Sequence, residues 1–267
     1  MKSTHRIQPL TSPANQWLKT IRRAVVHGDL TSEGLCVCEG FHLLDEALQC
    51  GRQVAVVVIS GDAARERVER LLGPLAGARV FEVNERLFHG LAATESPQGV
   101  LSLVLAPKWT IGDVCRGSGP LVVLDAVQEP GNAGAILRSA EAFGACGAVF
   151  LKGSASPYNA KNIRASAGSL FRLPFVHDVM DIHFLAAANE RPRPMFAAMP
   201  DGEVPLDRAD LRGDCTLIFG NEGRGVRPEI ARHATAVRIP TRGVESLNAG
   251  VAAGIVLYEA WCQRMSA

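Results

Sequence analysis

The stretch that decides the fold is Val127-Gln128-Glu129-Pro130-Gly131-Asn132-Ala133-Gly134, a turn rich in glycine and polar residues. The apolar residues 121–124 precede it, and residues 132–143 carry apolar side chains at helical spacing. An apolar run, a glycine-rich turn and an amphipathic segment predict a buried strand that leads into a helix. Glycine in such a turn lets the backbone come close to another backbone or to a ligand.

Two later turns have the same character. They are Phe219-Gly220-Asn221-Glu222-Gly223-Arg224-Gly225 and Ile239-Pro240-Thr241-Arg242-Gly243-Val244-Glu245-Ser246-Leu247-Asn248. Strands are also predicted at 148–151, 195–198 and 215–219, and helices at 160–167 and 247–263. Strands separated by helices predict a mostly parallel sheet covered on both faces. Since ligands bind at the carboxyl ends of such strands, all three turns are expected at one edge of the sheet.

The first part of the chain shows a second alternating pattern. Helices are predicted at 15–27, 41–50, 63–72 and 85–91, and strands at 35–38, 54–59, 80–83 and 100–105. This pattern indicates a small α/β/α domain. A stretch of polar residues, Gly and Pro begins near Pro107 and reads as a linker with one short turn of structure. We therefore expect two domains, residues 1–107 and 108–267.

Composition excludes several classes of protein. The formal net charge of +1 makes no global case for nucleic acid. The seven cysteines contain no CxxC pair and the histidines are isolated, so neither a disulfide framework nor a metal site is predicted. The sequence shows no apolar segment of membrane-spanning length and no signal peptide, which predicts a cytoplasmic protein without a membrane partner. A GxGxxG fingerprint is absent, which argues against a nicotinamide dehydrogenase.

Charge is uneven near the N-terminus. Residues 1–30 contain one acid, Asp29, against the basic residues Lys2, Arg6, Lys19, Arg22 and Arg23. A locally basic segment indicates either an anionic partner or an ordinary solvated helix face.

Arg138 lies off the apolar stripe of its predicted helix. Gly134 precedes it by four residues and Ala142 follows it by four, so both share its face of the helix. Small neighbours leave room for a ligand over the guanidinium. The alternative is a surface arginine paired with Glu141.

Two features of the last predicted helix each have two possible interpretations. Ser246 is either its N-cap or a contact to substrate. Gly250 and Gly254 form a GxxxG spacing, which allows close helix packing within one subunit or across a dimer.

In their order, the three turns resemble the three motifs of the SpoU (TrmH) family of RNA 2′-O-ribose methyltransferases, in the SPOUT superfamily. Residues 124–138 are similar to motif one, 219–225 to motif two and 239–248 to motif three. Residues 161–168 are similar to a recurrent family segment. The resemblance covers about residues 120–262, and residues 11–106 more loosely resemble the family's ribosomal-protein-like substrate-binding domain.

The resemblance implies an α/β fold: a C-terminal, parallel-sheet methyltransferase domain with a deep trefoil knot, and a smaller N-terminal α/β/α substrate-binding domain. It implies S-adenosylmethionine bound in the knot, an RNA partner and a homodimer formed through the C-terminal domain. By motif position, Gly220, Ile239 and Leu247 would hold the cofactor. The residues matching the family's functional polar set are Arg138, Asn132, Glu222, Ser246 and Asn248. Candidate phosphate contacts are Arg22, Arg23, Lys161 and Arg164.

The chain departs from the family pattern in small ways. Thr241 stands where Met is frequent, and Ala249-Gly250 follow Asn248 where Val-Ser is common. The second change falls on the surface expected to meet a dimer partner or the substrate.

The expected reaction transfers a methyl group to a ribose 2′-hydroxyl in RNA. The N-terminal domain favours ribosomal RNA by analogy. Arginine is effectively always protonated in proteins, so Arg138 is a poor general base by itself. Either a substrate phosphate helps Arg138 lose a proton, or Arg138 stabilises the developing alkoxide electrostatically. The alternatives are ribose methylation of tRNA, methylation of a base by a related enzyme, and a non-catalytic RNA-binding protein of the same fold.

Overall fold

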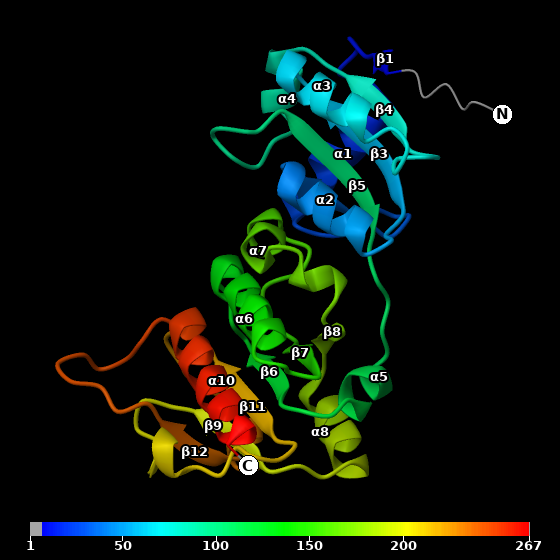
Figure 1. Cartoon of the computed structure of the whole chain (residues 1–267). Helices are drawn as coiled ribbons and strands as arrows, with labels where there is room; N and C mark the ends of the chain where they lie inside the picture. Colours follow the sequence, from blue (N-terminus) through cyan, green and yellow to red (C-terminus); the bar gives the residue numbers. More distant parts are fainter. Residues whose placement is uncertain (1–6, 267) are drawn as a thin grey trace. The chain divides into compact units, whose positions relative to one another are not determined.

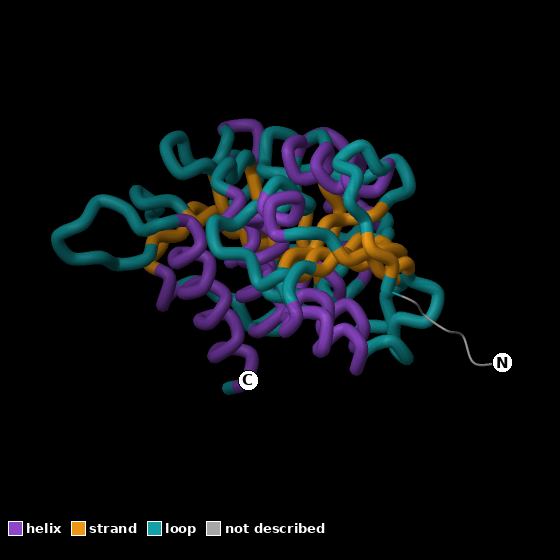
Figure 2. The backbone as a smooth tube through the Cα atoms, turned by 90° about the horizontal axis from the view of Figure 1, so that it is seen from above, coloured by secondary structure: helices purple, strands orange, loops and turns teal. Residues whose placement is uncertain are grey.

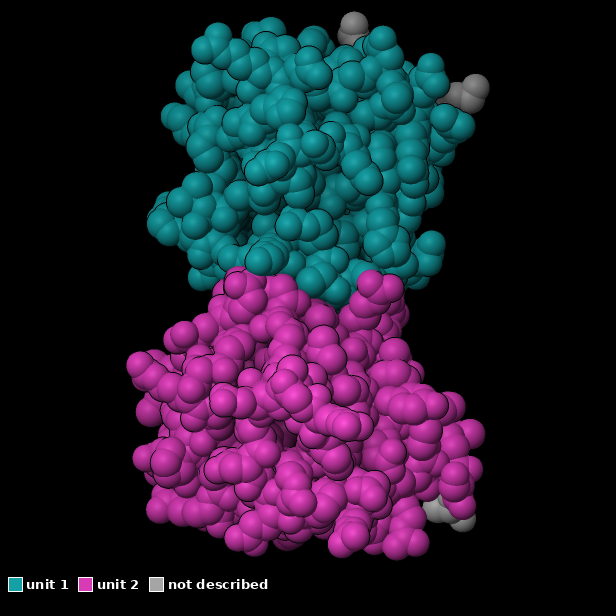
Figure 3. Space-filling view, turned by 90° about the vertical axis from the view of Figure 1, so that its left-hand side faces the viewer, with its two compact units in different colours: residues 1–107, 158–171 teal, residues 108–157, 172–267 magenta. Residues whose placement is uncertain are grey.

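The computed structural model describes residues 7–266, so Lys2 and Arg6 of the basic N-terminal segment lie outside the described residues. The chain divides into two compact units. Unit 1 comprises Met1–Pro107 and Tyr158–Phe171, and unit 2 comprises Lys108–Pro157 and Arg172–Ala267 (Figure 3). Figure 2 marks the helices and strands of both units.

Unit 1 is built on a mixed sheet with the strand order β1-β4-β3-β5-β2. Its strands are β1 (Gln8–Pro9), β2 (Leu35–Glu39), β3 (Val54–Ile59), β4 (Arg79–Glu82) and β5 (Val100–Leu105). Its helices are α1 (Gln16–His27), α2 (Phe41–Gln49), α3 (Asp62–Arg70), α4 (Glu85–His89) and α7 (Ala160–Ser166). The apolar stripes of α1 and α4 pack with Val56, Val58 and Leu103 of the sheet in one core. The predicted helices and strands of this unit therefore form.

The segment Tyr158–Phe171 belongs to unit 1, although its place in the sequence is inside the domain predicted for residues 108–267. Helix α7 packs against β2, and a Cβ on Gly28 would come within 2.9 Å of the side chain of Asn159, the N-cap of α7. The order of the elements along the sequence does not predict that this segment packs with unit 1, because the contacts join residues far apart in the sequence.

Unit 2 is built on a sheet in which every pairing is parallel, with the order β10-β12-β9-β11-β6-β7-β8. Its strands are β6 (Leu121–Asp125), β7 (Gly147–Leu151), β8 (Phe175–Val179), β9 (Met195–Ala198), β10 (Val204–Pro205), β11 (Thr216–Gly220) and β12 (Thr235–Arg238). Its helices are α5 (Ile111–Arg116), α6 (Pro130–Ala142), α8 (Asp181–Glu190), α9 (Pro228–Ala231) and α10 (Ala249–Met265). The prediction of a mostly parallel sheet is confirmed.

Helices cover both faces of this sheet. Residues of α5, α8 and α9 share one core with alternate residues of β6, β7 and β11. Helix α6 packs on β7, α10 packs on β9 and β11, and the two helices lie side by side (Figure 1). Gly250 faces Ala135 and Gly254 faces Ser139, so the GxxxG spacing serves helix packing within the subunit. Among the described helices, none has both the length and the apolar character needed to cross a membrane.

The sequence patterns missed β8, α8, β10, α9 and β12. Strand β8 lies at the edge of the sheet and exposes His177 and Asp178, so it has no continuous apolar run. Strand β12 has four residues, of which only Val237 is buried. Short or edge strands carry a weak apolar signal because few of their side chains enter the core.

The side chain of Arg193 holds the linker segment that leads into β6. It is 4% exposed and lies before β9. One guanidinium nitrogen donates to the carbonyl of Gly119 at 3.0 Å, and another donates to Cys115 and Gly117 at 2.8 and 2.6 Å. A single arginine thus satisfies carbonyls in the last turn of α5 and just after it.

Replacing Arg193 with Met is expected to lower the free energy of unfolding by about 2–4 kcal/mol, because three carbonyls lose a charged donor. Urea denaturation followed by circular dichroism measures the change. The control is Arg212→Met, which removes a solvent-exposed arginine that pairs with Asp210, and it should leave the free energy of unfolding nearly unchanged. Equal losses in both variants would contradict a clamping role for Arg193.

Candidate active site

The three predicted turns follow β6, β11 and β12. Strand β6 pairs in parallel with β11, and Asp125 lies opposite Gly220. Strand β12 pairs in parallel with β9, which pairs in parallel with β11. The carboxyl ends of these strands share one edge of the sheet, so the predicted meeting of the three turns is confirmed.

The turn after β11 is closed by Asn221. Its side-chain oxygen accepts hydrogen bonds from the N–H groups of Gly223 and Arg224 at 3.0 and 3.1 Å. Its side-chain nitrogen donates to the carbonyl of Ala126 at 3.0 Å. One amide therefore shapes the second turn and ties it to the start of the first.

An ion pair with a buried carboxylate makes a second link between the same turns. Asp125 is inaccessible to solvent. It accepts hydrogen bonds from the backbone N–H of Arg227 at 2.7 Å and from its Nε at 2.6 Å. Removing one partner of a buried pair leaves an uncompensated charge, so both side chains are needed for the geometry.

A chain of hydrogen bonds joins all three predicted motifs. Asn248 donates from Nδ2 to Oδ1 of Asn132 at 2.9 Å, and Asn132 donates from Nδ2 to Oε1 of Glu222 at 2.8 Å. Oδ1 of Asn248 accepts from the N–H groups of Gly250 and Val251, which makes Asn248 the N-cap of α10. The cap orients the amide of Asn248, which in turn orients the amide of Asn132.

The carboxylate of Glu222 is the acceptor at the end of this chain. It also accepts from the backbone N–H groups of Gln128 and Glu129, each at 3.4 Å. Partial burial acts to raise the pKa of Glu222, but the hydrogen bonds from Asn132 and the backbone outweigh it and hold the pKa below its ordinary value. Glu222 therefore stays ionised at neutral pH and serves as an acceptor.

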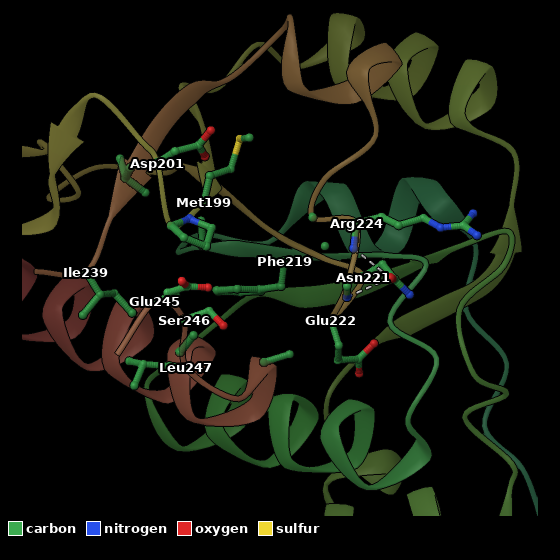
Figure 4. Close-up of a pocket in the computed structure, with 18 of the residues that line it drawn as sticks. Met199, Asp201, Phe219, Asn221, Glu222, Arg224, Ile239, Glu245, Ser246 and Leu247 are labelled. Atoms are coloured by element: carbon green, nitrogen blue, oxygen red, sulfur yellow. Dashed lines mark hydrogen bonds between the residues drawn. The ribbon is translucent and has the colours of Figure 1, made fainter. Parts of the chain in front are cut away.

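A cavity of about 450 Å³ opens beside this chain of hydrogen bonds. Its walls come from the loops after β9, β11 and β12 and from the first turns of α10 (Figure 4). The three predicted cofactor-holding residues, Gly220, Ile239 and Leu247, all line it, as do Glu222 and Ser246. Its volume falls in the range of small-molecule sites, roughly 300–1,000 Å³.

Gly220 is needed for the shape of the cavity wall. A Cβ at this position would collide with the backbone of Gly225 and Val226. Only glycine lets the two ends of the turn after β11 come this close together.

The structure decides against two of the alternatives that the sequence left open. Ser246 is not the N-cap of the last helix: α10 begins at Ala249 and Asn248 caps it. A side-chain oxygen must lie next to the free N–H groups of the first turn, and Asn248 occupies that position. The alternative for Arg138, a pair with Glu141, does not form either, and Glu141 pairs with Arg172.

Arg138 is exposed on α6 and, within residues 7–266, has no hydrogen-bond or ion-pair partner. It follows Asn132 by six residues on the same helix, an axial rise of about 9 Å. The described chain therefore brings Asn132, Glu222 and Asn248 together but leaves Arg138 outside the hydrogen-bonded group.

The four candidate phosphate contacts all belong to unit 1. Arg22 and Arg23 lie on α1, and Lys161 and Arg164 lie on α7. Arg22 is half-buried and donates to the carbonyl of Gly90 at 3.3 Å, whereas the other three are exposed. No group of His, Cys, Asp or Glu suited to a metal ion occurs in the described part of the chain.

Sequence reasoning missed Asp125, Arg227 and Asp201. Asp125 was inside the quoted first motif but had no visible partner. Arg227 comes just after the second motif, and nothing in its neighbourhood predicts a pair more than one hundred positions away. Asp201 lines the cavity. The sequence feature that could have indicated Asp201 is the Pro200-Asp201-Gly202 turn, which follows a predicted strand.

Replacing Asn132 with Leu is expected to raise the pKa of Glu222, because the hydrogen bond that favours the charged carboxylate is lost while burial remains. In the wild type, a lowered folded-state pKa stabilises the fold above the unfolded-state pKa, and this contribution is lost as pH falls through the folded-state value. A ¹³C NMR titration of the carboxyl carbon measures the shift. Ser246→Ala, on the same cavity, is the control, and an unmoved pKa in Asn132→Leu would refute the coupling.

Comparison with known proteins agrees with this arrangement. The model of the SpoU rRNA Methylase family matches residues 119–258, and the model of the MRM3-like substrate binding domain matches residues 29–102. A relative from Xanthomonas campestris, named the 23S rRNA guanosine 2′-O-methyltransferase RlmB, is 33% identical over 72% of this chain and 80% of its own. Bacillus subtilis RlmP, named a 23S rRNA guanosine 2′-O-methyltransferase, is 27% identical over 94% of this chain and 98% of its own.

A solved structure of a methyltransferase has the same fold as this chain. An AdoMet-bound rRNA methyltransferase from Sinorhizobium meliloti superposes with a TM-score of 0.83 at 29% identity, covering 95% of this chain and 97% of that one. The family model spans more than half of the sequence and contains all three turns of the site. The chain belongs to the SpoU rRNA methylase family.

Proposed function

We propose that this protein transfers a methyl group from S-adenosylmethionine to a ribose 2′-hydroxyl in RNA, with ribosomal RNA as the substrate. The observation that carries the proposal is the hydrogen-bonded group of Asn248, Asn132 and Glu222, whose last member, Glu222, lines a small-molecule cavity. Ribose recognition needs oriented donors and acceptors, and this group supplies them beside a cofactor-sized space. The names of the relatives RlmB and RlmP support ribosomal RNA over tRNA.

The cavity suits the proposed cofactor. Phe219, Val237, Ile239 and Leu247 make much of its wall apolar, which fits an adenine ring, and backbone at Gly220 offers polar groups. Carboxylates on the same wall suit a ligand with hydroxyl, amino and cationic groups. Gly220, Ile239 and Leu247 would hold the cofactor, which supplies a methyl group activated by its attachment to a sulfonium.

The polar group orients the acceptor. Asn132 and Asn248 have their amides fixed by the N-cap and by Glu222, so a ribose placed against them meets donors and acceptors in set directions. Glu222 holds the first and second turns together, because it binds N–H groups of one turn from a position on the other. Ser246, exposed on the cavity wall, is a further hydroxyl for substrate contact.

Arg138 is the residue that acts on the 2′-hydroxyl. Arg138 is exposed and has no partner within residues 7–266, which leaves the guanidinium available to RNA. A guanidinium stabilises a developing alkoxide by charge, and a nearby RNA phosphate can assist proton loss. The described chain does not join Arg138 to the cavity by any contact. In this proposal, RNA binding therefore brings the 2′-hydroxyl to Arg138.

The two units divide the task in this proposal. Residues 1–107 form the RNA-binding domain, in which Arg22 and Arg23 contact RNA phosphates. Lys161 and Arg164 of α7, which belongs to unit 1, are further phosphate contacts. Residues 108–267 form the methyltransferase domain, in which the segment 239–248 and α10 complete a trefoil knot. The return of α10 onto α6 after β12 supports such a path.

The methyltransferase domain forms a homodimer in this proposal. Helix α10 exposes an apolar stripe in which Val251 and Tyr258 are each 52% accessible and Met265 is 70% accessible. Phe143 extends the stripe through its ring contacts with Tyr258 and Trp261. Apolar side chains at this spacing on one helix face are typical of a surface that a second subunit covers.

Isothermal titration calorimetry with S-adenosylmethionine tests the cofactor proposal. The wild type should bind with a micromolar-range Kd. Leu247→Trp should abolish binding, because the larger ring fills the cavity. Ile182→Trp is the control, since Ile182 is 66% exposed on α8. A wild type that binds no cofactor while folded would refute the proposal and favour the non-catalytic RNA-binding alternative.

Replacing Arg138 with Ala is expected to lower methyl transfer by about 100-fold or more, because the charge that stabilises the alkoxide is removed. Affinity for S-adenosylmethionine should stay within a factor of two of wild type. Transfer of labelled methyl groups to ribosomal RNA, followed by a nucleoside digest, measures both rate and product. Full turnover in Arg138→Ala, or a methylated base in the digest, would contradict the assignment.

A further inference from the structure

The loop between β9 and β10 is held in place against β12. The N–H of Met199 donates to the carbonyl of Val237 at 2.9 Å. The guanidinium of Arg238 donates to the carbonyls of Gly202 and Glu203 at 2.7 and 2.8 Å. Gly202 is buried and lies so close to the backbone of Val237 and Arg238 that a Cβ would not fit. Asp201, in the middle of this loop, is therefore carried by a fixed backbone.

Asp201 lines the cavity and, within the described residues 7–266, has no hydrogen-bond or ion-pair partner. The other ionised groups on the wall differ from it. Glu222 already accepts three hydrogen bonds, and Arg224 extends away from Asp201 (Figure 4). Glu245 lies between β12 and α10, and no comparable clamp holds it in the part of the chain that the structure describes. Asp201 is thus a positioned carboxylate whose acceptor capacity is unused.

The position of Asp201 indicates which part of a ligand it meets. In the proposed function the transferred methyl group lies near Glu222, which accepts a hydrogen bond from Asn132, and the apolar wall around Ile239 and Leu247 suits adenine. Met199 and Asp201 lie on the side of the cavity opposite Ser246 and Leu247 in Figure 4. In the proposed cofactor, the ribose connects the adenine to the sulfonium. A carboxylate accepts hydrogen bonds from ribose hydroxyls in other nucleotide-binding sites.

We infer that Asp201 is a specificity-determining residue of the cofactor cavity, whose carboxylate accepts hydrogen bonds from the ribose diol of a nucleoside. Arg238 is a positioning residue for it, because it holds the loop without lining the cavity. The inference rests on the proposed function, and it assigns Asp201 to the nucleoside half of the cofactor and not to its charged amino-acid half.

Two ligands separate these halves. S-adenosylmethionine has the ribose diol, a sulfonium and an ammonium, whereas 5′-methylthioadenosine has the diol and neither cation. Calorimetry on Asp201→Asn should show affinity for both ligands reduced by a similar factor of about ten, as expected for loss of a charged hydrogen bond. Glu203→Gln is the matched control, because it removes the same charge two residues along the loop and outside the cavity. Its affinities should stay within a factor of two of wild type.

A second variant tests the positioning role. Arg238→Met should weaken both ligands, and the double variant with Asp201→Asn should be little weaker than Asp201→Asn alone, because both changes remove the same contact.

Each remaining outcome overturns the inference. Weaker binding of S-adenosylmethionine with unchanged 5′-methylthioadenosine would assign Asp201 to a cation. Three other results would refute the ribose contact. They are unchanged affinity of Asp201→Asn for both ligands, an equal loss of affinity in Glu203→Gln, and a wild type that does not bind 5′-methylthioadenosine. A wild type that binds neither ligand would refute the proposed function itself, which is a distinguishable result.

Discussion

The ion pair between Arg227 and the buried carboxylate of Asp125 is the interaction on which the site depends. It joins the end of β6 to the residues that follow the second turn, and Asp125 is shielded from water. A carboxylate in that position needs its partner, because an unpaired charge in the interior is strongly unfavourable. With this pair in place, Asn221 can reach Ala126 and Glu222 can reach the backbone of the first turn. These contacts therefore link the two turns to each other.

The third turn is attached to the other two through the N-terminus of α10. The first N–H groups of a helix lack internal partners, and Asn248 satisfies two of them. Its nitrogen must then point outward, toward Asn132, and the nitrogen of Asn132 must point toward Glu222. An ordinary rule of helix capping thus determines the direction of every hydrogen bond in the group, and the carboxylate at its end remains charged.

The close contact between α6 and α10 makes this possible. Gly250 approaches Ala135, and an added Cβ there would lie 3.3 Å from both the Ala135 side chain and the oxygen of Asn248. Gly250 therefore brings the two helices together with little side-chain volume between them. The outer face of α10 keeps its apolar stripe exposed, which separates the packing surface from the proposed dimer surface.

The sequence by itself determined the parallel sheet, the placement of the three turns at its edge and the residues Gly220, Ile239 and Leu247 of the cavity wall. These features follow from local apolar periodicity, from glycine in tight turns and from the resemblance that the turns carry. The tertiary structure alone decided that Asn248 and not Ser246 caps α10, that residues 158–171 pack with unit 1, that Arg172 and not Arg138 pairs with Glu141, and that Asp125 pairs with Arg227. The last three depend on contacts between residues far apart in the sequence, which local periodicity does not predict. The cap depends on the residue at which α10 begins, and local patterns place helix boundaries only to within a few residues.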